Sequence, residues 1–424
     1  MTDLKKTLGP LKGAGLMLNI VIGAGLLSLP GLAYQQAAEN AIWVWALCAL
    51  VALPLLSVFI IMGARFPDAG GVSSFAQKAF GRYAYIASSF IFLGAVSFGL
   101  PAIALTGGHY LSVLVPADPA ILAIALLLIA TGTQLASPEA ASRISAMVAS
   151  AILFSLLLIV AVGLSGITPE MREARALTGP TIGFSQLSVP FMMIFFAFTG
   201  WEVSAGTSEE FRNPKRDFPL AMGLSFLAAM LLYFSMAVIV HFTPIESNYE
   251  AAFSSIMQHH LGVWGGILMS VLAVVIIVAN LMGAIWAVSR MLLSLSRENV
   301  VPLDLSADET GRPLKAVFLV VGVLLAVLSL DLFNILAIED MLSLAGQNFI
   351  ILFAVAAASL MTLTSSLFEK LVALVAVGSV AVLLAQQDAA LLYPVLLSAA
   401  AGLLWAVQNR MNKTNIRNSP HSTS

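Results

Sequence analysis

Charged residues are scarce in this chain. They make up 10% of its 424 residues, against roughly 25% in soluble domains, while hydrophobic residues make up 59%. This composition excludes an ordinary soluble protein and indicates a polytopic membrane protein. The formal net charge of -2, without a clustered basic face, also excludes a nucleic-acid partner.

Cysteine and catalytic motifs are also rare or absent. The single Cys48 lies in an apolar run, which excludes an intramolecular disulfide and a thiolate metal cluster. His259 and His260 are adjacent, and adjacent side chains point apart on a helix, so we expect no metal site there. No H-E-x-x-H or G-x-S-x-G motif occurs. We therefore expect neither an enzyme nor a cofactor.

Long polar stretches are missing too, so no soluble domain fits between the apolar segments. A membrane helix needs about 20 mostly apolar residues. By this measure we expect one transmembrane domain over 1–408 and a disordered cytoplasmic tail over 409–424. The twelve spans are expected near 12–37, 41–64, 83–107, 119–136, 143–166, 184–208, 219–241, 262–290, 315–330, 335–362, 371–386 and 390–408. Eleven spans stay open, because the ninth, eleventh and twelfth are short or weakly bounded.

The basic residues fall almost entirely in loops on one side of these spans. Of 20 Lys and Arg, only Arg172 and Arg175 lie on the other side. An eleven-span register would scramble this alternation, and basic loops mark the cytoplasmic side. We therefore expect a multi-pass protein of the plasma membrane, the inner membrane of a bacterium, with both termini cytoplasmic.

Two spans are interrupted near their middles, the first at Gly23–Gly25 and the sixth at Thr199–Gly200. Gly-Ala-Gly alone is also typical of close helix packing. Interruptions at corresponding positions of two halves, however, are typical of transporters with inverted repeats. The interruptions are five spans apart, which predicts one repeat over 12–166, an inverted second repeat over 184–362, and two extra helices over 371–408.

Broken helices expose backbone groups of both signs. Freed N–H groups at the start of a second half-helix suit an anion, and freed carbonyls at the end of a first half-helix suit a cation. A zwitterionic amino acid matches both. Apart from Glu202, no charged residue lies clearly inside the membrane, so a neutral amino acid with an apolar side chain fits best.

Four motifs resemble those of the amino acid/polyamine/organocation permeases, in the family's order along the whole chain. They are IGAGLLSLP in helix 1, FPDAGGVSSFAQKAFG (Phe66–Gly81), FFAFTGWEVSAGTSEEFRNPKRDFPLAM (Phe195–Met222) and SRMLLSLSRENVVP (Ser289–Pro302). The run GLPAIAL in helix 3 and the run SEEFRNPKRDFPLAM look closest to the subgroup that exports methionine and branched-chain amino acids.

The resemblance implies an all-α integral membrane fold with twelve transmembrane helices, a 5+5 inverted-repeat (LeuT-like) core with helices 1 and 6 broken, and helices 11 and 12 outside it. It implies that Gly23, Ala24 and Gly25 hold the substrate carboxylate, and that carbonyls near Ile20, Ile22, Ala197 and Phe198 meet the ammonium. Thr199 and Gly200 would contact the ligand, Phe196 would gate it, and Trp201 would wall the pocket. Core packing stays open for Phe196 and Trp201.

Glu202 and Asn280 are the candidates for coupling and gating. Glu202 could take up and release a proton during the cycle, or tie its half-helix to a neighbour. Asn280, with Gln347 and Asn348, could complete a polar path or form interhelical hydrogen bonds. Helix 5 lacks the lysine of certain proton-coupled importers of the family. A sodium site stays open.

The leading hypothesis is a secondary transporter that exports small neutral amino acids, coupled to protons. An importer or exchanger of other neutral substrates is the alternative. A channel is more distant, because it would need repeated polar rings, and this chain has one glutamate and scattered amides. The expected partners are an amino acid, the lipid bilayer and a second copy of the chain, for which helices 11 and 12 offer a dimer surface.

Overall fold

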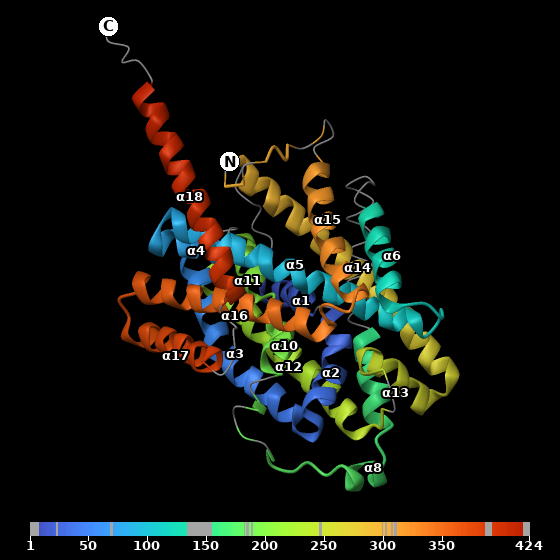
Figure 1. Cartoon of the computed structure of the whole chain (residues 1–424). Coiled ribbons are helices and arrows are strands. Elements are labelled where there is room, and N and C mark those ends of the chain that lie inside the picture. The colour runs from blue at the N-terminus through green and yellow to red at the C-terminus, as the bar shows by residue number, and fades with distance from the viewer. Residues whose placement is uncertain are drawn as a thin grey trace.

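The chain is helical throughout its described parts (Figure 1). The computed structural model describes residues 8–22, 24–67, 71–133, 155–181, 183, 186–187, 190–245, 248–298, 300–301, 303–306, 308, 312–385 and 392–418, without the side chains of Asn19, Ala24 and 409–418. Among these residues no strand forms, and extended chain pairs only at one bridge between Leu8 and Phe211.

The first part of the chain, up to residue 181, holds the helices that carry the first interruption and its supports. They are α1 (Pro10–Val21), η1 (Ala24–Leu27), α2 (Leu29–Ala37), η2 (Ala38–Asn40), α3 (Ala41–Arg65), α4 (Gly71–Phe80), α5 (Arg82–Ser112), α6 (Pro119–Gly132), a helix over Ser155–Ser165 and α8 (Pro169–Ala174). Residues 143–154 of the predicted fifth span lie outside the described residues.

The rest of the chain carries the second interruption and the peripheral helices. Its elements are α10 (Phe191–Phe195), η4 (Phe196–Phe198), α11 (Trp201–Ala205), η5 (Gly206–Glu210), α12 (Pro214–Phe242), η6 (Tyr249–Ala251), α13 (Ala252–Leu261), α14 (Val263–Arg297), α15 (Leu314–Leu332), α16 (Ile338–Leu363), α17 (Leu367–Leu384) and α18 (Leu392–Asn418).

Seven helical segments among the described residues are long and apolar enough to cross a membrane, and one of them joins α2 to α3. Shorter apolar helices cover Pro119–Gly132, Ser155–Ser165 and Leu392–Gln408. The predicted all-α membrane fold is therefore confirmed. The number of twelve spans and the inverted repeat stay predictions.

Several helices lie where loops were expected. α4 buries Val72 and Phe75 between the second and third spans, and α13 buries Phe253 and Ile256 before the eighth. Both are too short to cross a bilayer, so a search for long apolar runs misses them. α14 continues to Arg297, past its predicted end at 290. α18 continues to Asn418, into the segment expected to be a disordered tail.

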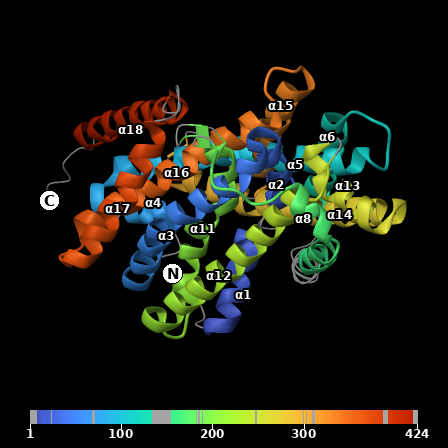
Figure 2. The ribbon, with the colours of Figure 1, turned by 90° about the horizontal axis from the view of Figure 1, so that it is seen from below.

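The two interrupted spans lie near the centre of the bundle. α1 ends at Val21, and the regular helix resumes only at Leu29, after the 3₁₀ turn η1. The sixth span is broken at two residues, Thr199 and Gly200, between η4 and α11. α3 and α12 cross beside these breaks, whereas α17 and α18 lie at one edge of the bundle and α6 and α13 at the other (Figure 2).

Candidate functional site

The two breaks meet at Gly200. Its φ of +101° lies in the left-handed region, which favours glycine. A Cβ added there would lie 3.1 Å from the Cα of Val21 and 3.4 Å from the carbonyl oxygen of Ile20. The backbone of the sixth span can therefore pack directly on the end of α1 only because residue 200 has no side chain.

The carbonyl groups at the ends of the first half-helices are held by hydroxyl groups. The hydroxyl of Tyr233 on α12 donates to the Ala197 carbonyl oxygen at 2.7 Å and lies 3.4 Å from that of Val21. The Phe196 oxygen accepts from the backbone N–H of Thr199 at 3.2 Å and from its hydroxyl at 2.8 Å. The Ala197 carbonyl, which was predicted to accept a hydrogen bond from the substrate ammonium, therefore already accepts one from Tyr233.

Glu202 is buried and caps the second half-helix of the sixth span. Both carboxylate oxygens accept from the backbone N–H of Gly200, at 3.1 and 2.9 Å. The carboxylate lies in the first turn of α11, where the partial positive charge of a helix N-terminus stabilises an anion. This contact lies within the sixth span itself and reaches no neighbouring helix, so the proton role and the tie to a neighbour both stay predictions.

The first break is held by α5. The N–H and the hydroxyl of Ser28 donate to the Gly25 oxygen at 3.2 and 3.3 Å. Thr106 places its hydroxyl 3.0 Å from that of Ser28, and Tyr110 donates to the Leu27 oxygen at 2.9 Å. Because all these groups are buried, the bonds compensate for backbone partners that the break removes.

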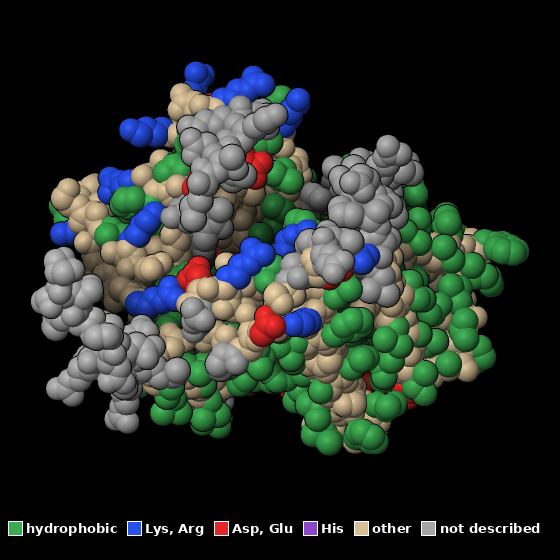
Figure 3. All heavy atoms as spheres, turned by 90° about the horizontal axis from the view of Figure 1, so that it is seen from above, with side chains coloured by type: hydrophobic (Ala, Val, Ile, Leu, Met, Phe, Trp, Pro, Cys, Tyr) green, Lys and Arg blue, Asp and Glu red, His purple; other side chains and the backbone are tan. Residues whose placement is uncertain are grey.

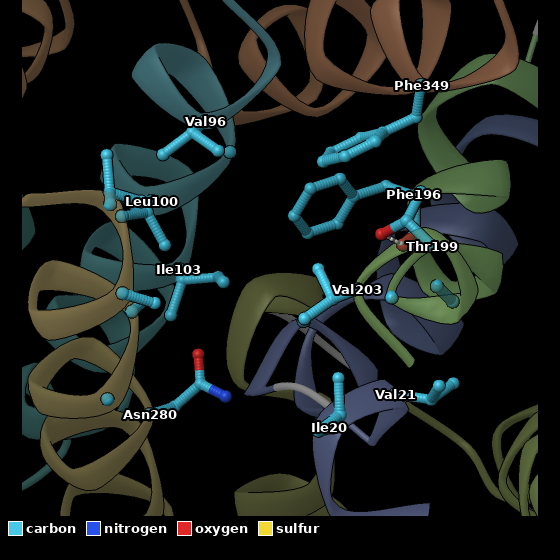
Figure 4. A pocket seen from close by; sticks show the side chains of 18 of the residues that line it. Ile20, Val21, Val96, Leu100, Ile103, Phe196, Thr199, Val203, Asn280 and Phe349 are labelled. Atoms are coloured by element: carbon cyan, nitrogen blue, oxygen red, sulfur yellow. Dashed lines mark hydrogen bonds between the residues drawn. The ribbon is translucent and has the colours of Figure 1, made fainter. Parts of the chain in front are cut away.

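A cavity of about 380 Å³ lies beside the crossing of the two breaks. α14 and α5 form one wall and the broken spans the other (Figure 4). The rings of Phe196 and Phe349 lie together on the second wall, with centroids 6.1 Å apart. Val96, Leu100 and Ile103 face them from α5. This part of the cavity wall is therefore apolar.

The structure brings together most of the predicted site residues. The cavity is lined by Ile20, Gly25, Phe196, Ala197, Thr199, Gly200, Glu202 and Asn280. The amide of Asn280 points into the cavity from α14 (Figure 4). Gly23 lies outside the described residues, and Ala24 is described only as backbone of η1.

Three predicted residues are buried but do not line the cavity, namely Ile22, Phe198 and Trp201. Phe198 packs against Trp45 and Tyr233, with ring centroids 6.0 and 5.4 Å apart. Trp201 packs against Phe226 at 5.6 Å. Gln347 and Asn348 also lie outside the lining. Packing thus accounts for these side chains without a ligand contact, and any role of their backbone groups stays a prediction.

Sequence reasoning missed Tyr233 and Phe349, which both line the cavity. A hydroxyl in the middle of an apolar span could have pointed to Tyr233, because a buried hydroxyl needs a partner. The run GLPAIAL carries a second signal that was left unused. A Cβ on its Gly99 would lie 2.7 Å from the Phe196 ring, so this glycine makes room for the aromatic side chain.

The cavity suits a ligand with a polar head and an apolar body. Glu202 is the only Asp, Glu, Lys, Arg or His among the described residues that line the cavity. The hydroxyl of Thr199 lies beside the Phe196 ring and the amide of Asn280 lies on the opposite wall, and most of the other lining side chains are apolar (Figure 4). No group of three or more His, Cys, Asp or Glu that could hold a metal occurs in the described part of the chain.

Comparison with known proteins identifies related amino acid permeases. The family model described as amino acid permease matches residues 8–408. The uncharacterized amino acid permease YecA of Bacillus subtilis is 30% identical over 341 residues, which are 77% of this chain and 78% of YecA. The L-methionine/branched-chain amino acid exporter YjeH of Escherichia coli is 32% identical over 267 residues, 60% of this chain and 61% of YjeH.

A more partial match is the vacuolar cationic amino acid transporter 4 of Arabidopsis thaliana, which is 30% identical over 141 residues, 32% of this chain and 23% of the relative. The relatives and the matching family are permeases and transporters rather than enzymes. With the family model covering nearly the whole chain, the resemblance seen in the four motifs is confirmed, and the chain belongs to the amino acid permease family.

Proposed function

We propose that the protein is a secondary active transporter of small neutral amino acids that works by alternating access. The observation that carries this proposal is the cavity where two broken helices cross, with backbone groups at the crossing and apolar walls beyond it. It is complementary to a zwitterion with an apolar side chain. In this proposal the core has twelve spans and a 5+5 inverted repeat (LeuT-like), with helices 11 and 12 outside it.

The proposed substrates are L-methionine, leucine, isoleucine and valine, and the proposed direction is export. Both rest on similarity to the exporter of Escherichia coli, together with the apolar lining. A cationic substrate is less suited to this cavity, because its one lining carboxylate, that of Glu202, already accepts from the N–H of Gly200. Import or exchange of other neutral amino acids is the alternative, and a channel is the distant one.

Coupling to protons is assigned in this proposal to Glu202, with Asn280 as a gating residue. Glu202 lines the cavity and touches the backbone at the break, so a change in its protonation would change the hydrogen bond to Gly200. Such a change would alter the fit between the two halves of the sixth span. This is the physical link from a proton to the conformation of the cavity.

The proposed location is the inner membrane, with both termini cytoplasmic. Lys and Arg side chains gather on the face shown in Figure 3, the face toward which α18 runs at its C-terminal end in Figure 1, and basic residues are typical of a cytoplasmic face. A homodimer through α17 and α18 is proposed on their exposed apolar side chains, among them Leu371, Leu374 and Leu403.

Counterflow in proteoliposomes tests the function. Vesicles preloaded with unlabelled methionine or leucine should accumulate the labelled amino acid transiently, and a pH gradient should change the rate of net efflux. A channel gives no counterflow. If none of the four amino acids moves or exchanges, the proposed function is wrong.

A further inference from the structure

Tyr233 stands at the point where both broken spans end their first halves. Its side chain comes from α12, is 1% exposed and lines the cavity. The ring is fixed by Trp45 and Phe198, with centroids 5.8 and 5.4 Å away. Trp45 and Phe198 also pack against each other, with centroids 6.0 Å apart, so the three rings form one cluster that limits where the hydroxyl can point.

The Tyr233 hydroxyl lies beside two carbonyl groups from distant parts of the sequence. The hydroxyl carries one hydrogen, and the 2.7 Å distance assigns it to the Ala197 oxygen rather than to the Val21 oxygen at 3.4 Å. In a continuous helix each carbonyl would accept from the N–H four residues later, and the breaks remove that arrangement. Tyr233 therefore supplies the Ala197 carbonyl in η4 with a donor, while its oxygen lies beside the Val21 carbonyl at the end of α1.

The Ala197 carbonyl keeps a second acceptor position, because a carbonyl oxygen has two lone pairs. Ala197 itself lines the cavity. A hydrogen bond that fixes one lone pair also fixes the direction of the other, and an oriented acceptor binds a ligand with less loss of conformational freedom.

We propose that Tyr233 is a positioning residue, which holds the Ala197 carbonyl oriented toward the α-ammonium group of the bound amino acid. This inference rests on the proposed transport of amino acids and adds a residue to it. The ligand group concerned is a primary ammonium, and 4-methylpentanoate, which has the side chain and carboxylate of leucine, has no donor in its place.

Tyr110 provides a matched control. It is a second fully buried tyrosine, and it donates to a carbonyl of the first break, that of Leu27, at 2.9 Å. Unlike Tyr233, it does not line the cavity. Replacement by phenylalanine therefore removes a similar bond in both cases, but only one of the two bonds belongs to the ligand cavity.

The experiment measures inhibition of labelled leucine counterflow by leucine and by 4-methylpentanoate, in wild type, Tyr233→Phe and Tyr110→Phe. Loss of one oriented hydrogen bond should weaken leucine binding about tenfold in Tyr233→Phe. Binding of 4-methylpentanoate should change far less, so the ratio of the inhibition constant of leucine to that of 4-methylpentanoate should rise. In Tyr110→Phe the ratio should stay at the wild-type value.

An unchanged ratio in Tyr233→Phe, or an equal rise in both variants, would overturn the assignment. Should Tyr233→Phe not accumulate as a monodisperse protein, Tyr233→His, whose shorter side chain takes the donor away from the Ala197 oxygen, replaces it, and an unchanged ratio in that variant also overturns the assignment. If wild-type protein shows no leucine counterflow while methionine, isoleucine and valine also fail, both the proposed function and this inference are wrong.

Discussion

The two breaks find hydrogen-bond partners for their interrupted backbone in different ways. The first break, from Ile22 to Ser28, is long, and groups on α5 hold it from outside. The break at Thr199–Gly200 is short. Side chains of the same span, Glu202 and Thr199, bond to its backbone, and Tyr233 on α12 holds the Ala197 carbonyl just before it. We expect a break held from α5 to change when α5 moves, and a break bonded within its own span to move more as a unit.

This difference predicts that a movement of α5 would act first on the first break. If α5 shifts relative to α1, the bonds of Thr106 and Tyr110 are the ones that change, while the capped start of α11 is not affected. The Tyr233 hydroxyl holds the Ala197 carbonyl of the second break and lies 3.4 Å from the Val21 oxygen at the end of α1. Substitutions at the two breaks should therefore differ in size.

The largest difference is expected between the glycines of the two breaks. Gly200→Ala places an L side chain at a φ of +101° and a Cβ 3.1 Å from the Cα of Val21. The left-handed conformation alone costs about 1–2 kcal/mol. Gly25→Ala meets only the edge of the Phe196 ring, at 3.3 Å, and has no left-handed strain. We expect Gly200→Ala to lower the melting temperature clearly more and to abolish counterflow.

Gly223→Ala serves as the control for this pair. Gly223 lies inside α12, with nothing within 4 Å of an added Cβ, so alanine there should be neutral or stabilising by up to about 1 kcal/mol. Thermal unfolding of the purified variants in detergent measures all three. Equal stability of Gly200→Ala and Gly223→Ala would show that the close approach to Val21 is not needed.

A middle-sized effect is expected at Glu202. Glu202→Ala removes the acceptor for the Gly200 N–H, and a donor left without a partner costs about 1–3 kcal/mol. Glu202→Gln keeps an acceptor oxygen and should retain most of the stability, but it cannot titrate. If Glu202 carries the proton, transport by Glu202→Gln should therefore become independent of pH, measured in vesicles across a pH series.

The pair of variants at Glu202 separates its two roles. If transport by Glu202→Gln depends on pH as it does in wild type, Glu202 does not carry the proton, even if Glu202→Ala is unstable. A flat pH profile combined with wild-type stability in Glu202→Ala would instead remove the capping role. Neither outcome depends on the identity of the amino acid used.

The sequence carried enough information to find both breaks. Glycine and a carboxylate at mid-span depth are costly in hydrocarbon unless a cavity accounts for them, so Gly200 and Glu202 were visible as anomalies. The same reasoning could not find the contacts of Phe198 and Trp201, which face other aromatic rings rather than the cavity. Which side of a broken helix faces a cavity depends on how the neighbouring helices pack, and local sequence does not record this.

Tyr233 and Phe349, which also line the cavity, were harder to predict for a related reason. Tyr233 and Phe349 lie far in sequence from both breaks, and their partners are backbone oxygens and another ring. A tyrosine in an apolar span is equally compatible with packing or with a site. Only the arrangement in space shows that its hydroxyl reaches two interrupted helices at once.

The smallest difference is expected between two threonines. Thr106→Val removes the link from α5 to Ser28 and should cost about 0.5–1.5 kcal/mol, the usual net value of one hydrogen bond. Thr199→Val leaves the Phe196 oxygen with its bond from the Thr199 N–H, so its cost should lie at or below about 0.5 kcal/mol, the low end of that range. Thermal unfolding of both variants, which keep the branched shape, measures the difference. A larger loss in Thr199→Val would mean that the second break depends on its hydroxyl, and the contrast between an externally held and a self-held break would then rest on Glu202 alone.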